Sequence, residues 1–528
     1  MQVFKFHRNS LSQVNEQHLN LVYRQEAYLP YINHTFSFEN FDRQIQEKER
    51  QFSKEKREVL SQSLLAQYKN INDNELIINN IESLKNEDTF TVTTGHQLSF
   101  FTGPLYFIVK ILHVIKLSER LKKMHPEKNF VPIYWMATED HDFEEVQSMR
   151  LFSKSFTWES EQKGSVGRFN LDGFDDVKNE IRAMFRDPEA EIHALLNAYD
   201  GQNYADATRN LVHFLFKKYG LVIIDGDDSA LKSEFSGIMR KELTEQFSYE
   251  KVIQTNEKLQ KEGVKIQVNP REINLFYIKN GLRERIVNEN DIFSINKVGT
   301  FSESEILKEL ENHPERFSPN VILRPLYQET ILPNIAYIGG VGEISYWLQL
   351  KGVFDAVNCT YPLIGVRNSV IWVDPLTTKK KAKINLLLED IFKSKDQLKK
   401  EFVQSNSDGA LDFKALDHAI DEIQGKIRDL VLSVDASMNS LAESEVTRIT
   451  KQMDALKAKM IKTSKSKHQV AMQSIDQIID KLFPDGNMQE RITNFFSFCP
   501  DGNYSKRLHN LYHCIDPEEK DMLILREL

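Results

Sequence analysis

The chain has 528 residues and a mass of 61.5 kDa, with 41% hydrophobic and 27% charged residues. That apolar fraction can bury a core, and 21 glycines, 15 prolines and three cysteines exclude collagen-like, disordered and disulfide-scaffold proteins. With 68 basic and 77 acidic residues the net charge is −9, so the chain as a whole has no electrostatic reason to coat nucleic acid or an anionic membrane.

The N-terminal sequence MQVFKFHRNSLSQVNEQH lacks the apolar core of a signal peptide, and no long apolar stretch that could span a membrane occurs. We therefore expect a soluble, cytoplasmic protein without a nucleic-acid or membrane partner. The cysteines Cys359, Cys499 and Cys514 show no C-x-x-C spacing and pair with no histidines at zinc-finger intervals. We interpret them as structural.

Short apolar runs that end in polar residues recur after a polar, helix-rich N-terminal region of about 85 residues. The predicted strands are the run DTFTVTTGHQ that ends at Gln97 and the runs VPIYWMA (131–137), LVIID (221–225), VILRPLYQ (321–328), IAYIGG (335–340) and LIGV (363–366). The predicted helices between them span 105–124, 205–219 and 342–354. Alternating buried strands and helices predict an α/β, Rossmann-like, doubly wound parallel sheet, in which ligands bind beyond the carboxyl ends of the strands.

The alternation of buried strands and helices is interrupted in two segments, 150–204 and 250–315. We interpret both as insertions into the core domain. In the second insertion, the runs KIQV, LFYI and RERIVN surround the turn Lys279-Asn280-Gly281 and predict short antiparallel strands.

The composition of the chain changes after Asp374-Pro375, because the next proline is Pro484. Apolar residues that alternate in steps of three and four predict an antiparallel coiled-coil hairpin with its tip near 433–440, capped by Asp435, although an ordinary amphipathic helix also fits. These residues are Leu416, Ile420, Ile423, Ile427, Leu430 and Val434, then Ile449, Met453, Leu456 and Met460. The expected domains are a core (1–375), a coiled coil (376–475) that forms a homodimer, and a C-terminal cap on the core (476–528).

Polar residues gather at two predicted strand ends. His96 and Gln97 end the first of these runs, in the loop before the next predicted helix, where a histidine can donate to an anion, although a backbone-bonded loop histidine fits as well. The second strand ends in Glu139, Asp140, His141 and Asp142, a concentration of charge that helix capping explains only in part. These four can bind a substrate ammonium or sugar hydroxyls, act as a general base through His141 or Asp140, or ligate a hard divalent metal.

The segment RPLYQETILPNIAYIGGVGEISYWLQL is the densest in candidate binding residues. A guanidinium there can pair with a carboxylate, and glycines let backbone N–H groups approach a ligand, although a tight turn explains the glycines equally well. The candidates are Arg324, Gln328, Tyr337, Gly339, Gly340 and Glu343, together with Arg367 after the last strand.

The motifs TTGHQLSFFTGPLYFIVK, PIYWMATEDHDFEEV and RPLYQETILPNIAYIGGVGEISYWLQL, followed by a coiled coil, resemble the cysteine ligase family of bacillithiol biosynthesis over nearly the whole chain. The usual Gly-Gln-Gln of that family is Gly95-His96-Gln97 here. The resemblance implies a Rossmann-type core, a dimerising coiled coil, and a reaction that joins L-cysteine to the amine of glucosaminyl malate. Such a reaction needs an activated acyl group, with ATP as the natural source. The family also implies an adenine nucleotide (ATP or ADP) site near Asn494. We predict no metal cofactor.

On this reading His96, Asp140 and His141 are catalytic and the other candidates bind substrate. Two different classes of function remain open. One is a metal-dependent hydrolase or nucleotidyltransferase that uses Asp140, His141 and Asp142 as ligands. The other is a catalytically silent scaffold whose coiled coil recruits partners.

Overall fold

The computed structural model describes residues 1–11, 13–406 and 412–527, and it divides into two compact units. Unit 1 comprises Met1–Ile371 and Glu490–Leu525. Unit 2 comprises Trp372–Gln489 and the C-terminal residues from Arg526. The chain thus leaves the first unit, builds the second, and returns. The predicted boundaries at 375 and 475 differ from these, because residues 476–489 cluster with unit 2 and Glu490–Leu525 with unit 1.

A five-stranded parallel sheet forms the centre of unit 1, as the alternating pattern predicts. Its order is β13 (Leu363–Val366), β12 (Asn334–Gly339), β2 (Thr89–His96), β3 (Asn129–Met136) and β6 (Val222–Asp225). Two buried threonines of β2 keep their hydrogen bonds, since Thr91 and Thr93 both donate to Asn334 Oδ1. The five strands therefore end at one edge of the sheet.

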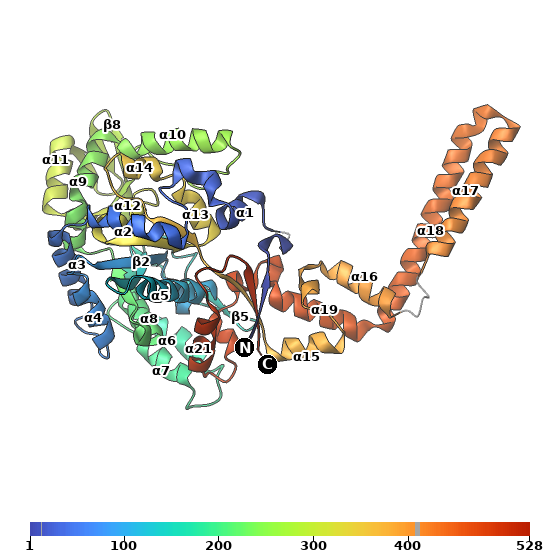
Figure 1. The fold of residues 1–528 in the computed structure, drawn as a ribbon, viewed down its shortest axis with the longest axis horizontal. Coiled ribbons are helices and arrows are strands. Elements are labelled where there is room, and N and C mark those ends of the chain that lie inside the picture. Colours follow the sequence, from blue (N-terminus) through green and yellow to red (C-terminus); the bar gives the residue numbers. More distant parts are fainter. Residues whose placement is uncertain (12, 407–411, 528) are drawn as a thin grey trace. The chain divides into compact units, whose positions relative to one another are not determined.

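Helices pack on the sheet through apolar residues. Phe41 and Ile45 of α2 (Phe41–Glu49) and Val114 and Leu117 of α5 (Tyr106–Met124) join one buried cluster with β2, β3, β12 and β13, and Figure 1 shows α5 running along β2. Trp135 of β3 contacts Tyr327 of α12 (Arg324–Ile331), which also contacts α9 (Ser229–Glu245). Other helices of this part are α1 (Glu16–Tyr23), α3 (Lys54–Gln67), α4 (Glu75–Ser83) and α8 (Tyr204–Phe216).

The first insertion folds as a hairpin and two helices, held by an aromatic cluster. Its elements are β4 (Ser148–Leu151), β5 (Lys154–Thr157), α6 (Phe174–Arg182) and α7 (Glu191–Ala198). Trp158, buried in this cluster, contacts Phe174 and Tyr204 at ring-centroid distances of 5.0 and 4.8 Å.

The second insertion contains a five-stranded antiparallel sheet in the order β10-β9-β8-β7-β11. Its elements are α10 (Phe247–Lys261), β7 (Leu275–Lys279), β8 (Leu282–Glu289), β9 (Ile292–Ile295), β10 (Gly299–Ser302), α11 (Glu303–Asn312) and β11 (Phe317–Pro319). The predicted turn at Asn280-Gly281 joins β7 to β8, with both residues at positive φ. The strand expected at KIQV is wrong, because residues 265–268 form no ladder.

Two further element predictions are wrong. VILRPLYQ forms a loop and the start of α12, because Asn320 Oδ1 accepts the N–H of Ile322 and Leu323 and Pro325 occupies the first turn of the helix. The helix expected over 342–354 is interrupted, giving α13 (Val341–Trp347) and α14 (Lys351–Asp355). VILRPLYQ is a short apolar run, in which periodicity does not separate strand from helix.

The C-terminal part of unit 1 braces a strained turn of the core. Phe101, Thr102 and Gly103 all have positive φ, and the buried amide of Asn494 donates to the carbonyls of Phe101 and Gly103. The segment contains α20 (Gln489–Ile492), α21 (Ser505–Cys514) and β15 (Met522–Arg526). The last strand lies between β1 (Gln2–Phe6) and β14 (Ser369–Val373) in a three-stranded sheet.

Unit 2 is helical, with α15 (Pro375–Lys383), α16 (Lys395–Ser405), α17 (Lys414–Val434), α18 (Asn439–Lys467) and α19 (Gln469–Leu482). Figure 1 shows α17 and α18 as an antiparallel pair. Asp435 accepts the N–H of Ser437 at the tip, as the sequence predicts. The predicted seam is only partly buried: Ile420 is covered, whereas Leu430 and Val434 are 70% and 73% exposed. This apolar stripe is a surface that the hairpin alone does not bury.

Candidate active site

A cavity of about 690 Å³ lies in unit 1 at the carboxyl ends of the parallel strands. His96 ends β2, residues 139–141 follow β3, Tyr337 lies in β12 and Arg367 follows β13. The lining includes ten of the predicted site residues: His96, Gln97, Glu139, Asp140, His141, Arg324, Tyr337, Gly340, Glu343 and Arg367. Residues scattered over some 270 positions of sequence therefore share one cavity, because parallel strands end at one edge.

The cavity is basic although the chain is acidic. Seven arginines and lysines line it, against three carboxylates. The basic residues are Lys110, Arg271, Arg283, Arg285, Arg324, Arg367 and Arg491, and the acidic ones are Glu139, Asp140 and Glu343. This composition suits a ligand that carries several negative charges.

Lys110 and Glu343 form an ion pair in the cavity wall. The buried Lys110 ammonium donates to both Glu343 carboxylate oxygens, at 2.9 and 2.8 Å, and to Gly95 O at 2.6 Å. Burial lowers the pKa of Lys110. Burial alone would raise the pKa of Glu343, but the Lys110 ammonium brings it below its ordinary value. The Glu343 carboxylate also accepts from Gly340 N and Tyr337 OH, so it organises the wall and is already hydrogen-bonded on both oxygens.

His96 is held as a neutral imidazole. Burial, followed by the nearby Lys110 charge, lowers its pKa to about 4. Its Nδ1 lies 2.8 Å from Gln97 O, and its Nε2 lies 3.1 Å from the hydroxyl of Tyr106. A carbonyl oxygen only accepts, so Nδ1 carries the proton and Nε2 accepts from Tyr106.

Asp140 presents a fixed carboxylate to the cavity. Its Oδ1 accepts the backbone N–H groups of His141 and Asp142, and its Oδ2 accepts the amide of Gln97 at 2.8 Å. The same Gln97 amide donates to Glu145 at 3.0 Å. These donors orient the carboxylate and leave part of it open to solvent, since 32% of the Asp140 side chain is exposed. It can therefore receive an ammonium or a proton from a ligand.

Glu139 is committed to a buried network. Lys232 lies 2.6 Å from Glu139 and 3.0 Å from Asp227, which also makes a bidentate pair with Arg168. Burial raises the pKa of Glu139, whereas Lys232 and Arg168 overcome burial at Asp227 and lower its pKa to about 2. The Glu139 charge is thus compensated by Lys232, a partner that the sequence did not indicate.

His141 lies beside the Arg283 guanidinium at the edge of the cavity. Arg283 donates to His141 Nδ1 at 2.9 Å and stacks over the ring of Phe276 at 3.9 Å. Burial, and then the Arg283 charge, lower the pKa of His141. Because Nδ1 accepts from a guanidinium, the imidazole proton resides on Nε2, and His141 is a hydrogen-bond donor toward the cavity in this arrangement.

The two predicted carboxylate-binding arginines differ. Arg367 is already paired with Glu490 at 2.9 Å. Arg324 has no carboxylate partner within the described residues: its guanidinium donates to Gln328 Oε1 and to the hydroxyl of Tyr346, at 3.1 and 3.4 Å. Arg324 is therefore the guanidinium of this pair that retains an open charge toward the cavity.

Four predicted site residues lie outside the cavity lining. Gln328 sits behind Arg324 and positions it, and Gly339 accepts the N–H of Arg367. Asp142 bonds to the backbone of Glu145 at the surface. Asn494 is the residue predicted near a nucleotide. Its amide N–H group donates to the carbonyls of the strained turn, and its Oδ1 accepts the N–H of Phe496.

Sequence reasoning missed several lining residues. Lys110 interrupts the apolar stretch YFIVKILHVI, and an ionisable residue on a buried helix face is a readable signal. Arg271, Arg283 and Arg285 come from the second insertion and Arg491 from the C-terminal segment, and no local pattern indicates that these fold onto the sheet edge. Within the described residues, no three His, Cys, Asp or Glu side chains are grouped as metal ligands.

Comparisons with known proteins agree with this architecture. A family model described as Bacillithiol biosynthesis BshC, N-terminal Rossmann-like domain, matches residues 6–368, and the BshC C-terminal coiled-coil domain matches 370–527. Proteins named "Putative cysteine ligase BshC" from Flavobacterium johnsoniae and Flavobacterium psychrophilum are each 43% identical, covering 88% of this chain and 89% and 88% of the relatives. That of Cytophaga hutchinsonii is 42% identical over 87% of both chains. In the part of the chain that the structure describes, no helix has the length and apolarity to cross a membrane.

Proposed function

The chain belongs to the BshC family of bacillithiol biosynthesis, and on that premise we propose that it joins L-cysteine to the free amine of glucosaminyl malate to form bacillithiol. The single observation that carries the proposal is the open guanidinium of Arg324 in the same basic cavity as the ordered carboxylate of Asp140. The substrate needs both, because it carries two malate carboxylates and one ammonium.

Arg324 binds the malate end. Its guanidinium lies between Trp135 and Tyr337, about 6 Å from each ring centroid, and Gln328 and Tyr346 hold it from behind. A planar guanidinium fixed in this way can donate two parallel hydrogen bonds to one carboxylate, which a flexible lysine ammonium cannot do. The malate carboxylates supply the negative charge that this part of the cavity lacks.

Asp140 receives the amine. An amine must lose its proton before it attacks an acyl carbon, and a carboxylate fixed by three N–H donors can hold the ammonium and take that proton. His141 donates through Nε2 beside it, and the neutral His96 keeps the β2 end in place through Gln97 and Tyr106. Hydrogen-bond direction in the described residues supports these assignments.

Amide formation also needs an activated cysteine carboxylate, and we take ATP as the source of that activation.

The alternative function, a metal-dependent hydrolase, has less support, because the Asp140 oxygens accept hydrogen bonds from N–H donors and Asp142 does not line the cavity. A silent scaffold would tolerate changes in the cavity, which the experiment below measures.

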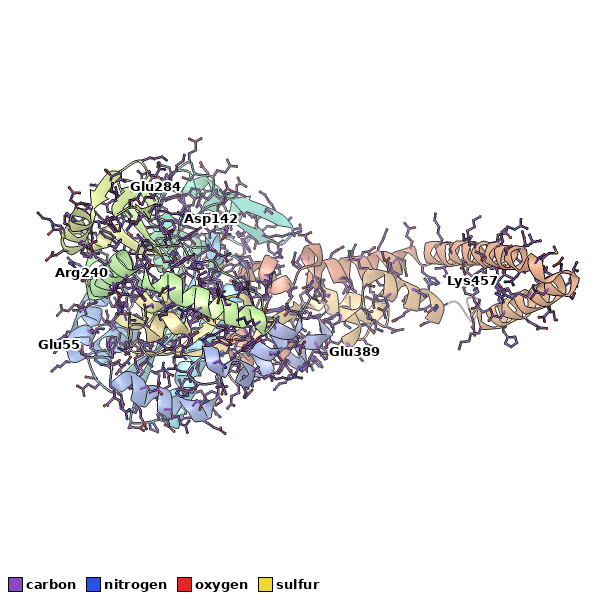
Figure 2. The ribbon with its side chains drawn as sticks, turned by 90° about the horizontal axis from the view of Figure 1, so that it is seen from above. Glu55, Asp142, Arg240, Glu284, Glu389 and Lys457 are labelled. Carbon is purple, nitrogen blue, oxygen red and sulfur yellow. The ribbon has the colours of Figure 1, made fainter. Side chains whose placement is uncertain are left out.

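The test is thiol profiling of cells that lack this protein, complemented with variants. We expect accumulated glucosaminyl malate and no bacillithiol, with rescue by wild type and by Arg240→Gln, an exposed arginine on α9 labelled in Figure 2, but not by Arg324→Gln. Arg324→Lys should restore little product because it loses bidentate geometry. Normal bacillithiol in the deletion strain, or full rescue by Arg324→Gln, would refute the proposal.

A further inference from the structure

A second hollow, of about 1110 Å³, adjoins the cavity. We call it the outer basin. Its floor is one face of the antiparallel sheet, where Arg283, Arg285 and Val287 alternate along β8 and Ser294 and Thr300 follow in register on β9 and β10. Its wall is the loop around Lys163. Gly164 brings this loop onto the β7–β8 turn, since a Cβ there would lie 2.5 Å from Gly281 O.

The outer basin and the cavity share a wall. His141, Phe276, Arg283 and Arg285 line both. A ligand in the basin can therefore reach a second ligand in the cavity across these four side chains. The mechanism above gives no role to Arg285, Lys163 or the hydroxyls of the floor.

The charge of the outer basin is open. Among its arginines and lysines, Lys297 is the one that forms an ion pair within the described residues, with Glu284 at 3.7 Å. Lys163, Arg283 and Arg285 have no ion-pair partner within the described residues, and Arg283 is fixed by His141, Phe276 and Ser318 instead. Three cations around a hydroxyl-bearing floor match a ligand with three or four negative charges, a polyphosphate.

We propose that the outer basin binds the polyphosphate chain of a nucleoside triphosphate that activates the carboxylate substrate in the adjoining cavity. The inference rests on the proposed function, because that reaction needs an acyl donor. A cysteine carboxylate oxygen bonds to a phosphorus, the phosphoanhydride bond there breaks, and its electron pair leaves on the departing phosphate oxygen. The amine nitrogen then bonds to the carbonyl carbon, the carbon–oxygen bond to the phosphoryl group breaks with its pair, and the nitrogen proton passes to Asp140.

This location differs from the nucleotide site that the family resemblance implies near Asn494. The amide of Asn494 already donates to two backbone carbonyls. The exposed face of Val287, 40% of which is open to solvent, gives the basin an apolar area beside the cations. A purine can lie there while the phosphates face Arg285.

The experiment is calorimetric titration of the full chain with ATP and, separately, with inorganic tripolyphosphate. Arg285→Gln removes an exposed, unpaired charge and should weaken both ligands about tenfold. Val287→Glu places a carboxylate on the basin floor and should weaken both as much or more. The controls are Arg240→Gln, which keeps wild-type affinity, and Arg324→Gln, which should impair glucosaminyl malate binding while leaving ATP binding unchanged. Circular dichroism confirms that each variant is folded.

Each outcome decides the inference. Weaker binding in Arg285→Gln and Val287→Glu supports it, and equal affinity for tripolyphosphate and ATP assigns the binding energy to the phosphates. Wild-type protein that binds neither probe at millimolar concentration, or Arg285→Gln that binds as wild type does, overturns it. If ATP binding depends on Arg285 but cells lacking the protein still make bacillithiol, the basin stands and the proposed function falls.

Discussion

The cavity of unit 1 and the α17–α18 hairpin of unit 2 depart from ordinary burial in opposite directions. The cavity places ionisable groups such as Lys110, Glu139 and Lys232 in or near the interior, whereas the hairpin exposes Leu430, Val434 and Leu456. Buried charges and exposed apolar stripes both cost free energy in an isolated chain. The first departure indicates small-molecule chemistry, and the second indicates a protein partner, which we propose is a second copy of the same hairpin.

The largest expected effect tests whether the cavity is chemical. Asp140→Asn should lower the rate of product formation about 100- to 10,000-fold, because an amide cannot take the amine proton. The rate is measured by mass spectrometry of purified enzyme with both substrates. Asp142→Asn is the matched control, since Asp142 lies outside the cavity and should keep wild-type activity.

Removing one of several neighbouring carboxylates would relieve charge repulsion and could be expected to stabilise the protein. We nevertheless expect Asp140→Asn not to stabilise it. Asp140 accepts from three N–H groups, and an Asn amide would face the Gln97 amide donor. We expect a small decrease in melting temperature. Asp140→Asn with wild-type turnover would assign this carboxylate to structure.

The next prediction removes a buried charge partner. Lys110→Met leaves the Glu343 carboxylate without its cation and should lower the free energy of unfolding by about 2 to 3 kcal/mol, somewhat less than for a fully buried pair, because 30% of the Glu343 side chain is exposed. Urea denaturation measures this change. The double variant Lys110→Met/Glu343→Leu should recover at least half of the loss, and a double variant as unstable as the single one would contradict the ion-pair account.

The third prediction concerns pH. The folded-state pKa of His96 is about 4, below the ordinary value near 6.5, so its contribution to stability is full above pH 6.5 and is lost as the pH falls toward 4. His96→Gln should remove that dependence, since an amide can donate to Gln97 O and accept from Tyr106. Between pH 7 and pH 5 the wild type should lose about 2 kcal/mol more than the variant in urea titrations. Parallel losses would mean that His96 does not carry the titration.

The smallest expected effect tests the hairpin. Leu430→Glu should weaken self-association of the full chain about tenfold or more, as judged by light scattering across a dilution series, because the leucine is 70% exposed in the single chain. Lys426→Gln is the control, because Lys426 lies on the same helix and, in the part of the chain that the structure describes, pairs with Glu422. Wild-type protein that is monomeric at micromolar concentration would remove the partner assignment.

Much of unit 1 could be predicted from sequence, because its parallel strands are short apolar or β-branched runs and its helices have strong periodicity. The ends of β2, β3 and β12 located the cavity, since their position follows from topology alone. Arg283 and Arg285 could not be found this way, because the second insertion folds onto the sheet edge through contacts distant in sequence. The spacing of apolar residues predicts the apolar seam of the hairpin. Spacing alone does not show whether this face packs within the chain or against another protein.

The brace of Asn494 on the turn at residues 101–103 has a consequence for protein synthesis. The contact joins positions 391 residues apart, and β15, close to the end of the chain, completes a sheet that begins at β1. At about 5 to 20 residues per second a ribosome needs about 20 to 80 s to make the intervening chain. During that time the strained turn has no brace and Arg367 has no Glu490. We therefore expect nascent chains of this protein to depend on chaperones until β15 has emerged, and variants that lack Glu490, Asn494 and β15 to be degraded in cells.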